Sequence, residues 1–307
     1  MAKMVSLVSL LFVLNLISPS FFFFSVLSEA HKLAPALYVF GSSAVDVGNN
    51  NKLRSFAKYD YLPYGIDFPD GASGRPTNGY NLVDYLAQSL GLEVPPPITS
   101  MNPSLSKNID GIHDYSLTLL RNEKRNNNST DNEAVHYAFS IDLVEKYVSH
   151  LEFLYRLGAR KFVVFDAEAM GCLPYEVRKA TPLDPVCVDA LNFLVFNFNR
   201  ILHRRINELG SKLPGATFII GNNFDHMVNL VQNPTSLGLK EGFKPCCKLT
   251  KLGKCDAKTL PCKERNDYAF FDGFNPTQAA NKVLAIECFN GTSGVCSPIN
   301  VRQLVAL

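Results

Sequence analysis

Short apolar runs that stop at turn residues recur along the chain and predict buried strands. The runs are residues 34–40 (APALYVF), which end at Gly41, residues 161–165 (KFVVF) and residues 216–220 (ATFII). Each has the length of a strand and is rich in β-branched or aromatic side chains. The chemistry of such a chain is expected at the loops that follow its strands, because ligands of open α/β sheets gather there.

Apolar residues with helical spacing lie between these runs. From 143 to 157 they fall at positions 143, 144, 147, 148, 151, 154 and 155, and Gly158 suits the position after a helix end. Further helices are expected at residues 81–90, 191–209, 224–231 and 277–289. Residues 61–79 and 93–130 are rich in Gly, Pro, Ser, Asn or Lys and are expected to be loops. The alternation predicts parallel β-α-β units with helices on both faces of one sheet.

Length and charge limit the possible functions. With 307 residues, 47% of them hydrophobic, the chain suits one large α/β domain. Its net charge is only +2, and its basic residues are scattered or in short runs such as residues 121–125. No nucleic-acid partner is therefore expected.

The N-terminus predicts secretion. Lys3 precedes an apolar run over residues 4–27, and Ser28 and Ala30 suit cleavage after Ala30. The division expected is a signal peptide at 1–30 and one domain at 31–307, with no stable membrane span after the signal is removed. An uncleaved anchor is the alternative, because the run approaches the length of a bilayer span.

The cysteines fit an extracellular protein. All eight lie in the second half of the chain, and an even count in a secretory context favours disulfides. Zinc is the alternative, but no Cys-x-x-Cys pair is present, so no metal or cofactor is expected. Glycosylation sequons begin at Asn128 and Asn290, and Asn127 opens an overlapping one.

A serine follows the first apolar run. Gly41-Ser42-Ser43-Ala44 lies where a strand is expected to meet a helix, a geometry that can expose a nucleophilic hydroxyl. The general G-x-S-x-G elbow is only half matched, because Val45 replaces its second glycine. Phosphate-loop and dinucleotide motifs do not fit, because Gly41 and Gly48 have neither spacing.

A series of longer motifs resembles the plant GDSL-type lipase/esterase family, within the SGNH hydrolase superfamily. The motifs, in order, are YVFGSSAVDVGNNN (38–51), PYGIDFP (63–69), SGRPTNG (73–79), LGARKFVVF (157–165), MGCLP (170–174) and YAFFDGFNPTQAAN (268–281). The resemblance implies a three-layer α/β/α, flavodoxin-like fold and serine-dependent hydrolysis of an acyl ester or lipid. Within the family, this chain would be a shortened and divergent member. It places the nucleophile at Ser43 and the catalytic acid at Asp272, with no metal or cofactor.

Two departures from the family pattern affect this machinery. The aspartate before the nucleophile is Ser42, and the terminal D-x-x-H-P motif reads Asp272-Gly273-Phe274-Asn275-Pro276, so asparagine replaces the catalytic histidine. An asparagine amide cannot act as a general base near neutral pH. Asparagine is, however, a good helix N-cap, and we expect Asn275 to cap the helix at 277–289.

The region between Leu92 and Leu157 is much shorter than the family pattern. Both family blocks that supply oxyanion donors are absent from it, and we expect an internal deletion that removes two strands of the sheet. Neither Asn266-Asp267 nor Gly221-Asn222-Asn223 fits as a replacement. His226, after a strand-helix junction, is the one conceivable substitute base, although a lone helical histidine is more often a surface or capping residue.

Three functions are compatible with the sequence. The leading hypothesis is a secreted esterase/lipase-like protein that is inactive or strongly impaired because the catalytic histidine is Asn275. The first alternative is an active carboxylic-ester hydrolase. The second is a noncatalytic secreted binding or assembly glycoprotein, for which the sequence offers no positive motif and no indication of a protein partner.

Overall fold

A three-stranded sheet organises the computed structural model, which describes residues 32–54, 56–101, 131–180 and 186–307. Its strands are β1 (Lys161–Phe165), β2 (Thr217–Gly221) and β5 (Cys296–Ser297), in that order. β1 and β2 run parallel with Lys161 opposite Thr217, and β5 pairs antiparallel with β2. A separate parallel pair consists of β3 (Glu241–Pro245) and β4 (Tyr268–Phe270).

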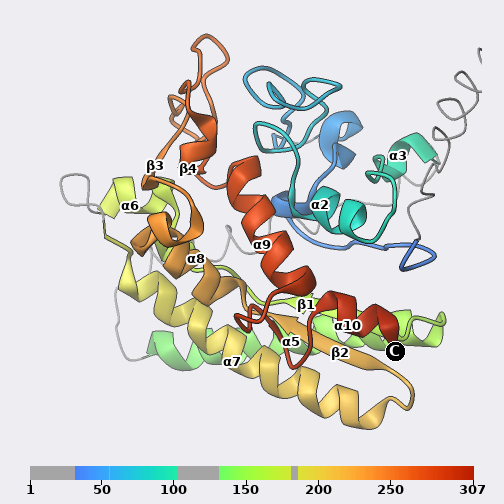
Figure 1. The fold of residues 1–307 in the computed structure, drawn as a ribbon. Helices are drawn as coiled ribbons and strands as arrows, with labels where there is room; N and C mark the ends of the chain where they lie inside the picture. The colour runs from blue at the N-terminus through green and yellow to red at the C-terminus, as the bar shows by residue number, and fades with distance from the viewer. Residues whose placement is uncertain (1–31, 55, 102–130, 181–185) are drawn as a thin grey trace, which may run out of the picture. The chain divides into compact units, whose positions relative to one another are not determined.

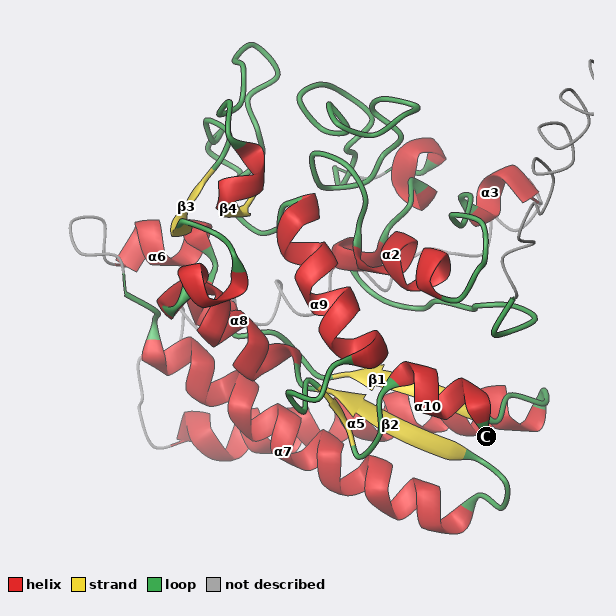
Figure 2. Cartoon of the chain, viewed as in Figure 1, coloured by secondary structure: helices red, strands yellow, loops and turns green. Residues whose placement is uncertain are grey.

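Helices cover both faces of this sheet (Figures 1 and 2). The α-helices are α2 (Leu82–Ser89), α3 (Ile98–Met101), α5 (Asp131–Arg156), α6 (Pro174–Ala180), α7 (Asp189–Lys212), α8 (Asn223–Gln232), α9 (Gln278–Asn290) and α10 (Val301–Ala306). The 3₁₀ turns are η1 (Ser43–Val45), η2 (Asn49–Lys52), η4 (Met170–Cys172), η5 (Pro234–Leu237) and η6 (Arg265–Asp267).

Alternation along the strands divides the core into two layers. Phe162 and Val164 of β1 pack with α5 and α7, whereas Val163 of β1 and Ile219 of β2 pack with α2, α9 and α10. Successive side chains of a strand point to opposite faces, so one apolar run can serve both layers. The expected α/β/α fold class is confirmed, and the described sheet is small, with only two parallel strands.

Most elements agree with the sequence pattern, but residues 34–40 do not form the expected buried strand. They are irregular, and Tyr38 and Phe40 are 81% and 70% exposed. Ala34 and Leu37 still pack against the layer of α2, α9 and α10. A strand needs a neighbour for its backbone groups, and no described strand pairs with this segment. The expected loop at 93–130 contains the single turn α3, and its residues 102–130 lie outside the described part of the chain.

All eight cysteines form disulfides, as the sequence predicts. The pairs are Cys172–Cys187, Cys246–Cys262, Cys247–Cys255 and Cys288–Cys296. The sulfur atoms are therefore not available as zinc ligands. Residues 33–307 form one compact unit, and no described helix has the length and apolarity required to cross a membrane.

Candidate active site

Ser43 lies on a tight turn at the beginning of η1. Asp46 organises this turn, because its carboxylate accepts the N–H of Gly48 at 2.9 Å, the N–H of Asn49 at 2.7 Å and the Nδ2 of Asn50 at 2.9 Å. Gly48 has φ 112°, and a Cβ there would lie 2.3 Å from the carbonyl oxygen of Ser73. The DVGNNN motif therefore encodes the turn, with glycine required by its backbone conformation.

No described residue forms a hydrogen bond with the Ser43 hydroxyl. Ser43 is half-buried, and within the described part of the chain its side chain makes no hydrogen bond, either to Asp272 or to Asn275. A serine nucleophile needs a base within hydrogen-bond reach. The described residues therefore hold Ser43 in place without activating it.

The Asp272 side chain, by contrast, is surrounded by donors. It is fully buried, and its Oδ1 accepts the N–H groups of Phe274 and Asn275 at 2.8 and 2.7 Å. The Tyr64 hydroxyl donates to Oδ2 at 2.7 Å. Burial raises the pKa of Asp272, and these hydrogen bonds oppose that rise by favouring the carboxylate.

Asn275 directs its amide at the same carboxylate. Its Nδ2 lies 3.0 Å from each oxygen of Asp272, and Asn275 is only 3% exposed. It is not the helix cap expected from sequence. Thr277 caps α9 instead, accepting the N–H of Ala280 at 3.2 Å. The buried carboxylate explains why the Asn275 amide is engaged elsewhere, because an anion in the interior requires hydrogen-bond donors.

The geometry allows Asn275 to replace one function of a histidine but not the other. Its Nδ2 donates to the acid, as a ring N–H would, but the remaining amide oxygen has no useful basicity near neutral pH. Tyr59 and Tyr64 border the site, and burial followed by the charge of Asp272 raises the pKa of both phenols. Both therefore stay protonated and provide no base.

His226 does not replace the missing base. It lies in α8, is 6% exposed, and its Nε2 is buried without a hydrogen-bond partner among the described residues. Burial lowers its pKa to about 4, so the ring is neutral. No hydrogen bond links it to Ser43 in the described structure.

A second acid-histidine pair lies beyond the end of β1 and was missed by the sequence interpretation. Asp166 follows β1 directly, and its Oδ2 lies 3.0 Å from Nε2 of His203 on α7. Its Oδ1 accepts the N–H groups of Asn223 and Phe224 at the start of α8. An aspartate directly after a strand was the available signal, but only the fold brings α7 beside it. The described contacts connect this pair to the beginning of α8 and not to Ser43.

The two segments that did not fit as oxyanion donors, at Asn222 and Asn266, lie at a helix start and in a 3₁₀ turn. The Asn222 side chain accepts the N–H of Asp225 at 3.1 Å and donates to its carboxylate at 2.7 Å, so it caps α8. Asn266 lies in η6, exposed. Neither position contradicts the expectation that these residues do not replace the oxyanion donors.

No described cluster of His, Cys, Asp and Glu could hold a metal ion.

The fold and these contacts define a class: a three-layer α/β protein in which a fully buried aspartate binds the amide of an asparagine three residues later. Its family model, the GDSL-like lipase/acylhydrolase, matches residues 125–288. From Arabidopsis thaliana, GDSL esterase/lipase At1g71691 is 33% identical (92% of this chain, 88% of the relative), and GDSL esterase/lipase 7 is 32% identical (90% and 93%). The chain belongs to this family.

The alignment with the first of these relatives extends over 340 residues, which exceeds the 307 residues of this chain, so it contains gaps in this chain. Family membership supports an esterase/lipase-like function with an ester or lipid as the substrate class.

Proposed function

We propose that this chain is a secreted GDSL esterase/lipase-like protein whose serine-dependent ester hydrolysis is strongly impaired or lost. The observation that carries this proposal is the position of Asn275, whose Nδ2 is 3.0 Å from both carboxylate oxygens of Asp272. The acid keeps its orienting role toward residue 275, but the group that it orients cannot accept a proton from Ser43.

The magnitude of the defect follows from the chemistry. General acid-base assistance contributes about 10²- to 10⁴-fold to such reactions. Loss of the oxyanion donors removes about another 10²- to 10³-fold in turnover. With neither a base nor these family blocks, Ser43 is expected to hydrolyse esters close to the background rate.

Secretion is part of the proposal. Residues 1–30 serve as its signal peptide and residues 31–307 as the mature domain, and the pairing of every cysteine supports an oxidising compartment. Asn290, the last residue of α9, is exposed and is accessible as a glycan acceptor. The other acceptor, Asn128, lies outside the described residues.

The test compares hydrolysis of short-chain and long-chain nitrophenyl esters by the mature protein, Ser43→Ala and Asn275→His. The mature protein and Ser43→Ala are expected to give the same background rate. Asn275→His is expected to recover little, because the oxyanion donors are still missing. Turnover of the unmodified protein that disappears in Ser43→Ala would contradict the proposal.

Labelling with a fluorophosphonate supplies an independent readout. The reagent reacts with activated serines, so Ser43 is expected to label no faster than serines elsewhere on the surface. Selective labelling of Ser43, identified by peptide mass analysis, would show that an activating group exists and would overturn the assignment of impairment.

A further inference from the structure

The loop between β3 and β4 concentrates positive charge. Residues 244–263, here called the lysine lobe, comprise the end of β3 and most of the connection to β4. They contain six lysines and one acidic residue, Asp256, whereas the whole chain has a net charge of only +2. The lysines are spaced along the chain, so the sequence contains no dense basic run. The fold gathers them on a loop that extends beyond β3 and β4, away from α7 (Figure 1).

Most of this charge has no acidic partner. Lys248, Lys251, Lys258 and Lys263 are exposed, and none forms an ion pair with any described residue. The one acid of the lobe, Asp256, accepts the backbone N–H of Lys258 at 3.0 Å. These four lysines therefore produce a local positive potential that the lobe does not neutralise.

Large apolar side chains are exposed beside these lysines. Leu252 and Leu260 belong to the lobe and are 63% and 89% exposed. Phe56, 94% exposed, is adjacent, because Nζ of Lys254 binds its carbonyl oxygen and that of Lys58. Exposed leucine and phenylalanine on a lysine-rich segment are typical of surfaces that enter the boundary between lipid headgroups and acyl chains.

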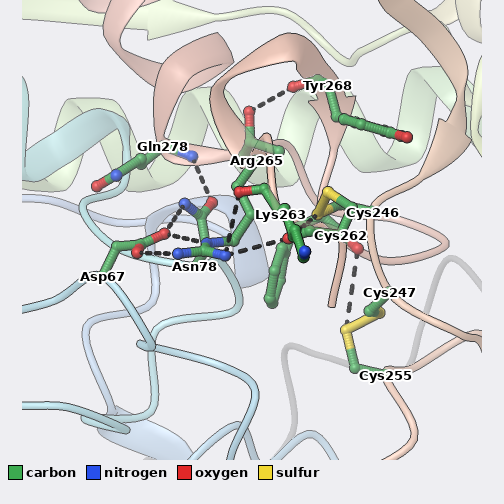
Figure 3. The surroundings of a disulfide bond; sticks show 12 residues. Asp67, Asn78, Cys246, Cys247, Cys255, Cys262, Lys263, Arg265, Tyr268 and Gln278 are labelled. Carbon is green, nitrogen blue, oxygen red and sulfur yellow. Dashed lines mark hydrogen bonds and ion pairs between the residues drawn. A yellow bond between two sulfur atoms is a disulfide. The ribbon is translucent and has the colours of Figure 1, made fainter. Parts of the chain in front are cut away.

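The lobe is also held in a fixed shape. Two disulfides, Cys246–Cys262 and Cys247–Cys255, close it from within (Figure 3). The hydroxyl of Tyr61 donates to the carbonyl of Cys255 from outside the lobe. A surface that is ordered before binding loses little conformational entropy when it binds.

We propose that the lysine lobe, together with Phe56, docks on anionic lipid bilayers. The four unpaired lysines bind headgroup phosphates, and Leu252, Leu260 and Phe56 insert at the level of the ester groups. A soluble anionic polymer would use the lysines alone and would leave the leucines in water. The combination of charge and exposed apolar side chains therefore favours a bilayer.

Hydrogen bonds connect the lysine lobe to the candidate active site. The N–H of Cys255 donates to the hydroxyl of Tyr64 at 3.0 Å, and that hydroxyl donates to Asp272. The lobe is thus built on the same buried tyrosine as the candidate active site. The inference requires no catalysis, so it stands whether or not Ser43 is active.

The experiment is co-sedimentation of the mature protein with vesicles. One set is phosphatidylcholine alone, and the other is an equimolar mixture of phosphatidylcholine and phosphatidylglycerol. Binding is expected only to the mixed vesicles and is expected to weaken as salt is raised. Equal binding to both sets, or binding to neither, would overturn the proposal.

Two variants separate the contributions of charge and apolar surface. In the first, Lys248, Lys251, Lys258 and Lys263 are changed to Gln, and each lysine near a charged bilayer is worth about fivefold, so a loss of at least tenfold in partitioning is expected. In the second, Leu252→Ser and Leu260→Ser keep the charge and should also weaken binding at least tenfold.

A matched control changes the same number of cations elsewhere. Lys146, Arg200, Arg204 and Lys212, on α5 and α7, are replaced by Gln, and this protein should bind mixed vesicles nearly as well as the unmodified chain. An equal loss in this control would mean that net charge, not the lobe, drives binding. If the two leucine substitutions have no effect while polygalacturonate competes with the vesicles, the surface binds a polyanion and the proposal is wrong.

Discussion

The candidate active site has two halves that differ in their hydrogen bonds: the surroundings of Asp272, here called the acid half, and those of Ser43, here called the serine half. Around Asp272, groups of Tyr64, Phe274 and Asn275 donate hydrogen bonds to a fully buried carboxylate. Around Ser43, the turn is well bonded through Asp46, yet the hydroxyl has no partner among the described residues. The Asp272 side chain therefore takes part in the hydrogen bonding of the interior, whereas the Ser43 side chain does not among the described residues.

The preceding residues explain part of this difference. The segment 34–40 that leads to Ser43 is not in the sheet, and Tyr38 and Phe40 are exposed. Asp272 instead follows β4, and the backbone of Phe271 bonds that of Asn275 at 2.9 Å. Loss of the Asp272 carboxylate would leave several buried donors without an acceptor, which is costly whether or not the residue takes part in catalysis.

Removing the acid should therefore have the largest effect. Asp272→Ala leaves the hydroxyl of Tyr64 and the amide of Asn275 as buried donors without an acceptor, and at about 1–3 kcal/mol for each donor a loss of about 2–6 kcal/mol in the free energy of unfolding is expected. Urea denaturation followed by circular dichroism measures it. Asp272→Asn, which keeps one acceptor oxygen, should lose less. A loss below that of a typical surface substitution would show that the acid half is not a structural centre.

The buried His226 is expected to make the stability of the fold depend on pH. Burial lowers its folded pKa from 6.5 to about 4, so the folded state binds fewer protons between these values and stability is lost as pH falls from 6.5 through 4. The full difference is about 3 kcal/mol. His226→Leu should remove this acid sensitivity and have a smaller effect at pH 7.

The control for this prediction is His203, which is 37% exposed and hydrogen-bonded to Asp166. His203→Gln should leave the acid dependence that comes from His226 in place. Urea midpoints between pH 4 and 7 for the three proteins measure the effect. A parallel shift of His226→Leu at every pH would mean that the buried ring does not titrate on folding.

A third prediction separates the two functions considered for residue 275. Thr277→Ala should cost about 1 kcal/mol, because Thr277 caps α9. Asn275→Ser would preserve stability if residue 275 were the cap, since serine is an equally good cap. It should instead destabilise the protein, because the Nδ2 donors to Asp272 are lost. Thermal unfolding of both variants gives the comparison.

Sequence periodicity was sufficient to predict those helices and strands whose structure is determined by their own residues. The strands at 161–165 and 216–220 and the helices at 191–209 and 224–231 agree with the structure to within a few residues, except that α7 is longer at both ends. Their apolar patterns supply two faces of a sheet or one face of a helix, and these patterns are local.

The features that sequence reasoning missed depend on partners that a local apolar pattern does not identify. Residues 34–40 have the composition of a strand, but a strand also needs a neighbour, and the described sheet offers none to it. Asparagine is typical of a helix N-cap, but the amide of Asn275 binds the carboxylate of Asp272. The pair of Asp166 and His203 joins residues 37 positions apart, and no local pattern encodes it.

Ser43→Ala should have the smallest effect. Its hydroxyl makes no hydrogen bond in the described structure, so the change in unfolding free energy is expected to lie within about 0.5 kcal/mol. Asp46→Ala is the matched control in the same turn, and it should destabilise the protein clearly, because the N–H groups of Gly48 and Asn49 lose their acceptor. Urea denaturation of the two variants side by side tests this contrast. The Asp46 side chain stabilises the turn, whereas the Ser43 hydroxyl is expected to contribute nothing to stability. A large loss in Ser43→Ala would mean that Ser43 has a stabilising partner, and the two halves of the site would then be alike.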